Sequence, residues 1–300
     1  MQKTLRSIHA IDAGILFMLG SALISAMNGA VAKVLGGQIS ALEIVFFRNL
    51  IGTAIILFTL WHTRPALPGG KLPLLLLRGF FGFVAMILFF YTITVIPLGE
   101  AITLNKTSPL FVAILAFFLL KERLNRYGVL ALFIGFAGVA FITQPAGFSM
   151  SYEHFLGLLG GFFAACAYAT IKTIRHIYDA RVIVLSFVGL GTLLPGVLFL
   201  LAPHVDAPEA LRFLFPQFAL PQTPQVWGLI AFMALISTLS QWLLTKAYSL
   251  GRAGIVGVVS YTNIPFAVGF GWALGDPFPN LWVWLGIGMI VTAGLLLKKS

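Results

Sequence analysis

The chain has 300 residues, of which 59% are hydrophobic and only 9% are charged. A soluble domain carries about 25% charged residues because it needs them to cover its surface. The composition therefore excludes an ordinary soluble enzyme, a disordered chain and a nucleic-acid-binding domain, in spite of a formal net charge of +10. A single cysteine, Cys166, excludes an intrachain disulfide and a cysteine-rich metal site, so we expect neither a metal nor a cofactor.

Ten apolar segments follow one another along the chain, each close to the ~20 residues that a membrane-spanning helix needs. None alternates strictly between apolar and polar residues, so we expect helices rather than the strands of a β-barrel. The first segment is too long for the core of a signal peptide and has no small-residue cleavage pattern behind it, so we expect it to be retained. The expected spans are residues 13–35, 41–61, 73–96, 99–119, 127–145, 154–173, 182–203, 225–249, 254–275 and 280–297.

Basic residues between these spans predict the orientation. Twelve of the nineteen lysines and arginines fall in segments on one side of the membrane, whereas the other side holds Arg212 alone. Because positive charge is retained on the cytoplasmic side, both termini are expected to be cytoplasmic. The twelve residues are Lys3, Arg6, Arg64, Lys71, Lys121, Arg123, Arg126, Arg175, Arg181, Arg252, Lys298 and Lys299.

The two halves of the chain, residues 1–145 and 146–300, resemble each other weakly. Residues 26–33 (AMNGAVAK) match 165–172 (ACAYATIK), and residues 105–109 (NKTSP) match 261–265 (YTNIP). Since each half has five spans, an odd number, the second half must enter the membrane upside down. Inverted repeats are a recurring device of secondary transporters, because two similar halves can open alternately to either side.

The longest connection, roughly 203–224, contains five prolines and the run 209–215 (EALRFLF). We expect this run to lie on the outer membrane surface, with a plain extended loop as the alternative.

Motifs along the chain resemble the drug/metabolite transporter superfamily, specifically its EamA-type ten-helix exporters. This resemblance implies ten spans in two inverted five-helix repeats around a central substrate cavity. Asp276 stands where we expect that family's glutamate, so a role for this acid is less secure. The motifs are residues 43–50 (EIVFFRNL), 97–101 (PLGEA), 108–111 (SPLF), 119–124 (LLKERL), 264–266 (IPF) and 275–277 (GDP).

Charged residues inside the spans are candidates for transport, because each costs about 2.5–3.5 kcal/mol to insert at the membrane centre. Arg48 and Lys106 are expected about two turns below the outer surface, with Glu43 and Glu100 closer to it. This predicts a cluster of the four in the outer half. In one interpretation Arg48 forms a buried ion pair with Glu43 or Glu100 that fixes helix register. In the other, Arg48 or Lys106 binds an anionic group of the substrate, and the glutamates serve coupling.

Pro109 favours a substrate role for Lys106. Proline removes a backbone hydrogen bond and frees a carbonyl near Asn105. Irregular backbone at membrane depth normally lines protein or water. Lys33 and Lys172, at opposite ends of matched spans, are interpreted either as a pair of gate charges or as side chains that snorkel to the interface. Arg78 and Lys246 are expected to snorkel.

Polar and aromatic side chains within the spans are candidates to line the cavity, with helix packing as the alternative for each aromatic. The amides are the stronger candidates, since an amide that faces lipid goes unsatisfied. With no counterpart charge in the second half, the predicted cavity is positive and asymmetric. The substrate-contacting residues predicted in all are Asn28, Arg48, Tyr91, Asn105, Lys106, Tyr168, Gln241, Trp242, Tyr261 and Asn263.

The sequence as a whole predicts a secondary transporter, by resemblance an exporter, in the bacterial inner membrane. Its expected substrate is a small polar or amphipathic metabolite, and a positive cavity suits one with a carboxylate or phosphate. Membrane lipid is the expected surrounding partner, nucleic acid is not a partner, and no oligomeric state is predicted. A non-coupled channel and a membrane scaffold are the alternatives. An intramembrane enzyme is disfavoured, because the aspartates lie outside or at the ends of spans and the histidines are scattered.

Overall fold

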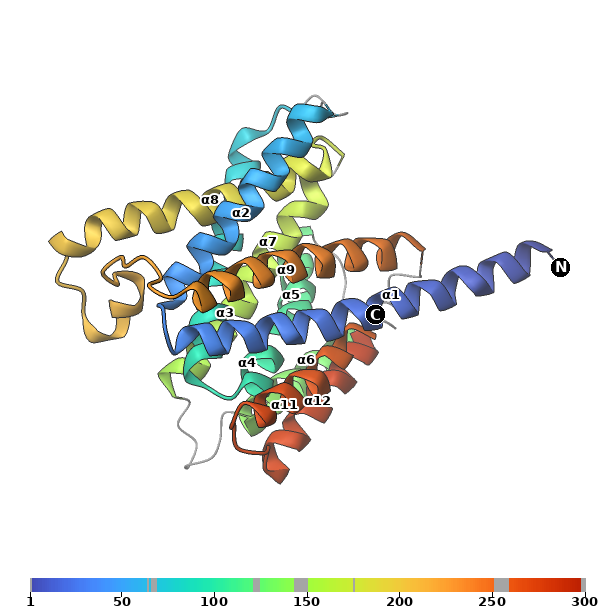
Figure 1. Cartoon of the computed structure of the whole chain (residues 1–300). Helices are drawn as coiled ribbons and strands as arrows, with labels where there is room; N and C mark the ends of the chain where they lie inside the picture. The colour runs from blue at the N-terminus through green and yellow to red at the C-terminus, as the bar shows by residue number, and fades with distance from the viewer. Residues whose placement is uncertain are drawn as a thin grey trace.

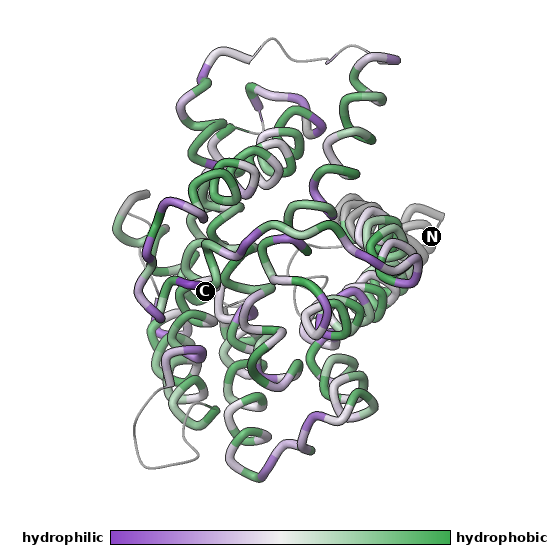
Figure 2. The backbone as a smooth tube through the Cα atoms, turned by 60° about the vertical axis from the view of Figure 1, so that its left-hand side comes forward, coloured by the Kyte–Doolittle hydropathy of each residue, from purple (hydrophilic) through white to green (hydrophobic). Residues whose placement is uncertain are grey.

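The computed structural model describes residues 2–63, 65, 69–120, 125–142, 151–174, 176–250 and 259–297. Every regular element in these ranges is a helix, and no strand occurs among them. The hydropathy along the backbone follows the helices, with apolar residues along their lengths and hydrophilic ones gathered at turns and ends (Figure 2). The prediction of an all-helical fold is therefore confirmed for the described residues.

The first half of the chain forms six helices, because one expected span is divided into two. The division falls at residues 106–107, so that neither piece is long enough to cross a membrane alone. The helices are α1 (Gln2–Gly36), α2 (Ala41–His62), α3 (Leu72–Val95), α4 (Leu98–Asn105), α5 (Ser108–Leu120) and α6 (Arg126–Ile142).

The second half repeats this order with a long connection between two of its helices. The expected span 254–275 lies partly outside the described residues, and its described part opens on a short 3-10 turn. The elements are α7 (Tyr152–Ile174), α8 (Ala180–Leu201), η1 (Ala202–His204), η2 (Glu209–Leu214), α9 (Pro224–Leu250), η3 (Ser260–Thr262), α11 (Asn263–Ala273) and α12 (Leu281–Leu297).

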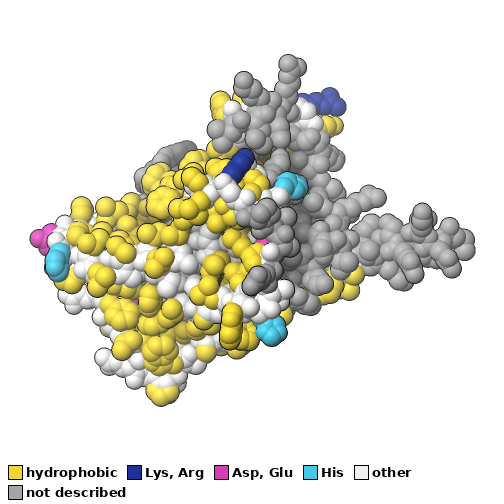
Figure 3. Space-filling model, turned by 90° about the horizontal axis from the view of Figure 1, so that it is seen from above, with side chains coloured by type: hydrophobic (Ala, Val, Ile, Leu, Met, Phe, Trp, Pro, Cys, Tyr) yellow, Lys and Arg dark blue, Asp and Glu magenta, His cyan; other side chains and the backbone are white. Residues whose placement is uncertain are grey.

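The outer surface of this bundle is suited to lipid. Within the described residues, five helices are long and apolar enough to cross a membrane: Ala13–Gly36, Ala41–His62, Leu72–Val95, Tyr152–Ile171 and Arg181–His204. In the view from above, hydrophobic side chains cover most of the described face, and charged ones occur at isolated places (Figure 3). Side chains as large as Trp61 and Leu200 are 84% and 77% exposed, which a protein surrounded by water rarely allows over so wide an area.

Helices from the two halves pair with one another across the bundle (Figure 1). Helix α1 packs along α9, and α3 packs along α7. Helix α2 packs on α8, α4 on α11, and α6 on α12. Each helix of one half has a counterpart at the same place in the other half. Exchanging counterparts turns the α1–α9 pair into the α7–α3 pair and leaves the pairs α2–α8, α4–α11 and α6–α12 unchanged. This is the pattern expected of two halves related by a two-fold axis.

The break between α4 and α5 rests against a face of small residues on α7. A Cβ added at Gly157 would lie 2.9 Å from Leu104 Cδ1, and one at Gly161 would lie 2.7 Å from Thr107 Oγ1 and 3.0 Å from the Leu104 carbonyl oxygen. The spacing of four residues puts both glycines on one face of α7. The two glycines thus form a small-residue packing face, and it supports the irregular backbone directly.

We expect Gly161→Ala to destabilise the protein, because the added methyl group must displace either Thr107 or the carbonyl oxygen of Leu104. Overpacking of this kind costs about 1–3 kcal/mol. Thermal unfolding of the purified protein should therefore shift to lower temperature. Gly189→Ala on α8 is the control, since a Cβ there meets nothing within 4 Å. Equal shifts for the two variants would show that the break does not depend on this contact.

Candidate functional site

A cavity of about 160 Å³ lies in the interior of the bundle, among α1, α3, α4, α7, α9, η3 and α11. The residues around it belong to both halves of the chain. None of them is acidic. They are Met18, Ser21, Ala22, Ser25, Phe89, Ile102, Asn105, Lys106, Tyr168, Ser240, Leu244, Ser260 and Asn263.

The helix break brings Lys106 to this cavity. Helix α4 ends at Asn105, the Lys106 N–H donates to the Ile102 carbonyl (2.9 Å), and the Thr107 hydroxyl donates to the Leu104 carbonyl (2.6 Å). The local hydrogen bonds satisfy the end of α4, and the lysine occupies its C-cap. A cation is favoured at this position because the C-terminal end of a helix carries partial negative charge. The irregular backbone predicted from Pro109 is therefore present and lines the cavity.

The ammonium group of Lys106 has no protein counter-charge in the part of the chain that the structure describes. Its Nζ forms no hydrogen bond or ion pair there, and the cavity wall offers it no carboxylate. An uncompensated charge inside a membrane is costly. The geometry therefore leaves Lys106 as the cationic group that faces this small cavity.

The matching segment of the second half reaches the same cavity from the opposite wall. Asn263 begins α11 directly after the η3 turn, and its side-chain amide donates to the Ala22 carbonyl of α1 (2.7 Å). Two serines beside it join α1 and α9. The Ser21 hydroxyl donates to the Ser240 carbonyl (2.8 Å), and the Ser240 hydroxyl donates to the Ser21 carbonyl (3.1 Å). The repeat-matched segments 105–109 and 261–265 thus both contribute to the cavity wall.

Four of the ten predicted substrate-contacting residues line the cavity: Asn105, Lys106, Tyr168 and Asn263. Three others do not line the cavity: Asn28, Tyr91 and Tyr261. Tyr91 instead stacks on Phe213, with ring centroids 4.2 Å apart, and the other two lie elsewhere in the bundle. The side chains of Gln241, Trp242 and Lys172 lie outside the described residues.

The wall also contains serines that sequence reasoning did not select: Ser21, Ser25, Ser240 and Ser260. Serine is common in packed membrane helices as well as in cavities. Only the position of each serine in the bundle marks it as part of the site.

The predicted cluster of Glu43, Arg48, Glu100 and Lys106 is wrong. None of the four is a hydrogen-bonding or ion-pair partner of another in the described structure. Arg48 donates to the Ser237 hydroxyl from Nε (3.0 Å) and Nη2 (2.6 Å), and it does not pair with either glutamate. The proposed buried ion pair fails because each of its acids already has other partners near the end of the bundle.

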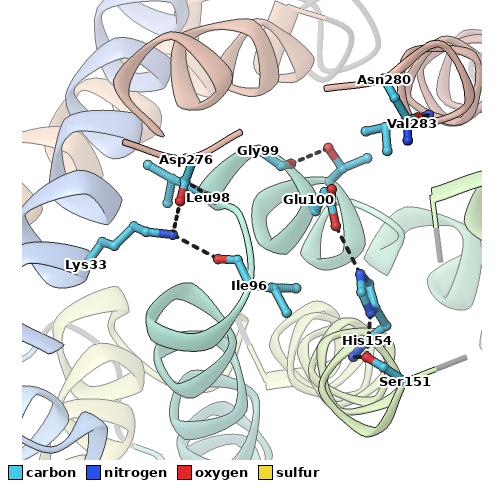
Figure 4. A network of polar contacts seen from close by, with 11 residues as sticks. Lys33, Ile96, Leu98, Gly99, Glu100, Ser151, His154, Asp276, Asn280 and Val283 are labelled. Atoms are coloured by element: carbon cyan, nitrogen blue, oxygen red, sulfur yellow. Dashed lines mark hydrogen bonds and ion pairs between the residues drawn. The ribbon is translucent and has the colours of Figure 1, made fainter. Parts of the chain in front are cut away.

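Glu100 belongs to a group of polar contacts at one end of the bundle (Figure 4). Lys33 at the end of α1 pairs with Asp276 beyond α11, with Nζ and Oδ1 2.6 Å apart, and also donates to the Ile96 carbonyl (3.0 Å). The other carboxylate oxygen of Asp276 accepts the Leu98 N–H (2.9 Å). The expectation that Lys33 snorkels to the interface is therefore wrong, since its charge joins the two halves of the chain instead.

Two further glutamate contacts strengthen the same end. The Glu100 carboxylate lies 3.0 Å from Nε2 of His154, whose Nδ1 lies 2.6 Å from the Ser151 hydroxyl (Figure 4). Glu43 caps α2 with Ser40 and accepts the Ala219 N–H (2.8 Å). The contact of His154 with Glu100 was not predicted, because the histidines are scattered along the sequence.

The connection before α9 covers this end as well. The extended loop, the alternative for residues 209–215, is not what forms there, since Glu209–Leu214 is the short 3-10 helix η2. Phe213 stacks on Tyr91 of α3, and the Ala210 carbonyl accepts from the Tyr152 hydroxyl of α7. The cavity lies away from this end. Met18, on its wall, precedes Lys33 by fifteen residues of α1, or about 22 Å along the helix axis. Polar contacts thus join the two halves at the Lys33 end, and the cavity lies further along.

A divided helix that carries a charged residue into a cavity between two halves of a membrane protein is typical of secondary transporters. The comparison with known families agrees. The chain belongs to the EamA-like transporter family, whose sequence profile matches residues 12–144 and again 151–298.

Several relatives of known name cover nearly the whole chain. The pseudopaline exporter of Pseudomonas aeruginosa is 32% identical over 296 residues, 98% of each chain. An uncharacterized transporter of Helicobacter pylori is 32% identical over 290 residues, 95% of this chain and 94% of its own. The riboflavin transporter of Vibrio cholerae is 26% identical over 217 residues, 72% of this chain and 68% of its own.

A chain of known crystal structure has the same fold. It superimposes with a TM-score of 0.59 at 16% sequence identity and covers 95% of this chain and 96% of its own. At this level of identity the likeness concerns the fold alone. Fold and family together make this a multi-pass membrane protein of a transporter family.

We expect the Lys33–Asp276 pair to be energetically coupled. Removing one partner of a buried pair costs about 3–5 kcal/mol, because the other charge is left uncompensated. Lys33→Gln or Asp276→Asn alone should therefore lower the thermal unfolding temperature more than the two changes made together. The measurement is a double-mutant cycle on detergent-purified protein. Additive effects of the two single changes would show that the pair does not hold this end closed.

Proposed function

We propose that this protein is a secondary active exporter of a small metabolite that carries an acidic group, a carboxylate or a phosphate. The observation that carries the proposal is the placement of Lys106, a cation at a cavity with no acid among the described residues of its wall. A substrate anion would supply the missing counter-charge. The printed names of two relatives, a pseudopaline exporter and a riboflavin transporter, support transport of small metabolites.

The transport cycle that we propose is alternating access. The network of Lys33, Asp276, Glu100 and His154 closes one end, and the cavity occupies the part of the bundle beyond it. Closure of this kind favours a carrier over a permanently open channel. Breaking the Lys33–Asp276 pair would release α1 from the end of α11 and open the other face of the cavity.

We further propose ten spans with both termini in the cytoplasm of the cell and two inverted repeats, residues 1–145 and 146–300, in the inner membrane. The exchange pattern of helix pairs and the two matches of the family profile support the repeats. The distribution of basic residues supports the orientation, which puts the Lys33 end outside.

Within the cavity we assign the substrate anion to Lys106 and polar contacts to Asn105, Tyr168 and Asn263. Arg48 is assigned to holding α2 against α9, because Ser237 accepts two of its donors. Glu100, in contact with His154, is the stronger candidate for proton coupling, since the contacts of Glu43 are those of a helix cap.

We expect Lys106→Gln to abolish binding of the substrate anion. Ligands are first found by thermal shift of the purified protein against amino acids, nucleotides and organic acids, because binding stabilises the protein by RT ln(1 + [L]/Kd). A hit should then be transported in proteoliposomes by the wild type and not by the variant. Arg126→Gln, at an exposed helix start, is the matched control. Unchanged anion transport after replacing both Arg48 and Lys106 by Gln would refute the proposal.

Coupling is tested in the same vesicles with an imposed pH gradient. If Glu100 carries the proton, Glu100→Gln should leave counterflow exchange of the substrate intact while removing its acceleration by the gradient. A variant that still responds fully to the gradient would exclude Glu100 as the coupling residue.

The orientation predicts that reporters fused to either terminus report the cytoplasm, whereas a cysteine placed at Gln217, in the connection before α9, is labelled from outside intact cells. A Cys166→Ser background removes the native thiol. Labelling of a terminus from outside would contradict the proposed topology.

A further inference from the structure

The polar side chains of the cavity wall differ in whether they already have a hydrogen-bonding partner. Ser21 and Ser240 bond each other between α1 and α9, and the Asn263 amide nitrogen donates to the Ala22 carbonyl. These three side chains belong to buried residues, with exposed fractions of 2%, 6% and 3%. Their hydrogen bonds hold helices together, so their presence on the wall does not indicate what the cavity binds.

Asn105 and Ser25 also line the cavity, but their side chains are free. Neither the Asn105 amide nor the Ser25 hydroxyl makes a hydrogen bond within the described part of the chain. Ser25 is exposed and lies one turn beyond Ser21 on the same face of α1. Asn105 is half-buried and directly precedes Lys106 at the end of α4. Polar groups that face an interior cavity in this way are available to water or to a ligand.

These two free groups need a different partner from the one that suits Lys106. An ammonium group only donates hydrogen bonds, whereas an amide or a hydroxyl both donates and accepts. A carboxylate accepts only, so it cannot pair with the carbonyl oxygen of the Asn105 side chain. A hydroxyl group of a ligand can donate to that oxygen and exchange hydrogen bonds with Ser25. The wall therefore suits a ligand that carries hydroxyl groups in addition to its acidic group.

The charge of the wall excludes a second kind of ligand group. Lys106 lines the cavity, and no acid stands among the described residues around it. Arg78 is not part of this wall: expected to snorkel, it is instead 8% exposed, and its guanidinium lies over the Phe187 ring, 4.9 Å from the centroid. An ammonium group on the substrate would add a positive charge beside Lys106 with no described carboxylate to meet it. The site thus disfavours amino acids.

The size of the cavity makes these pairings decisive. Its volume of about 160 Å³ is below the roughly 300–1,000 Å³ of a pocket for a drug-sized ligand. A small ligand that enters it displaces the water that would otherwise bond the free wall groups. Leaving a desolvated donor or acceptor unpaired is costly, so a site that bonds a hydroxyl strongly rejects an analogue without one.

We propose that the substrate is a small hydroxy acid, whose acidic group binds Lys106 and whose chain hydroxyl groups bind Asn105 and Ser25. Ser25 thereby becomes a substrate-binding residue beside those assigned above. This inference rests on the proposed transport of anions and narrows its substrate class. An unsubstituted acid would leave the amide and the hydroxyl unpaired, and an amino acid would bring an unmatched positive charge.

The test uses ligands of the same chain length that differ in one property each. Gluconate carries the acid and the hydroxyl groups, hexanoate the acid alone, 6-aminohexanoate an acid and an amine, and glucitol the hydroxyl groups alone. Binding to the purified full-length protein is measured by thermal shift and titration. The wild type should bind gluconate at least tenfold more tightly than each of the other three.

Variants of the wall show which residues produce this preference. Ser25→Ala and Asn105→Ala should each reduce the advantage of gluconate over hexanoate about threefold or more, the effect of one hydrogen bond, and leave hexanoate binding unchanged. Lys106→Gln should lose both acids. Ser240→Ala is the matched control, because its hydroxyl is already bonded to Ser21, so it should lower stability and keep the advantage. If Asn105→Ala does not fold, Ser25→Ala carries the test.

Four results would overturn the inference. If the wild type binds gluconate and hexanoate equally and Lys106→Gln loses both, the hydroxyl groups are not recognised, and anion transport through Lys106 still stands. If 6-aminohexanoate binds most tightly, the substrate carries an amine. If Ser25→Ala and Asn105→Ala weaken all ligands equally, these residues act on structure. If none of the ligands binds, the substrate class is wrong. Glucitol that binds as tightly as gluconate would show that Lys106 binds no acid, and would refute the proposed function itself.

Discussion

The exposed end of a helix inside a membrane is the constraint on which this site depends. Hydrocarbon offers no hydrogen bonds, so irregular backbone survives there only where protein or water satisfies it. The break after Asn105 meets this condition through the Thr107 hydroxyl, the local N–H groups and the close approach of Gly161. Because the break is supported in this way, Lys106 can leave the helix axis at its C-terminal end and face the cavity.

The pairing of charged side chains distinguishes two regions of the interior. At the Lys33 end, the Lys33–Asp276 ion pair, the Leu98 N–H bond to Asp276 and the Glu100–His154 contact join the ends of α1, α4, α7 and α11. Further along, Lys106 has no acidic partner among the described residues, and a cavity lies beside it. Compensated charge thus goes with closure, and uncompensated charge goes with space for a ligand. That division is the physical basis of the alternating access that we propose, since opening the Lys33 end would expose a paired lysine and aspartate to water.

Arginines in such an interior need not be equivalent. Arg48 donates from Nε and Nη2 to the Ser237 hydroxyl and from Nη1 to Met86 Sδ, and its guanidinium also lies over the Phe90 ring. Its donors are therefore already satisfied by neighbouring side chains. Arg78 has a ring face and open donors. The difference lies in whether a hydroxyl from a neighbouring helix reaches the guanidinium, which only the packing of α2 on α9 and of α3 on α8 decides.

The helical membrane architecture was predictable from the sequence, because apolar length and the absence of strict alternation leave few other solutions in lipid. The break near Asn105 was also predictable, since Pro109 lacks the N–H that would bond the Asn105 carbonyl in a continuous helix. Partners across the bundle were not: Lys33 with Asp276, Glu100 with His154 and Arg48 with Ser237 each join residues at least 54 positions apart. Sequence periodicity fixes which residues share a face of one helix, but helix rotation and crossing determine what that face meets. For this reason the sequence determined the class of protein and the residues able to carry charge into the membrane, and the tertiary structure alone decided which of those charges are neutralised and which face the cavity.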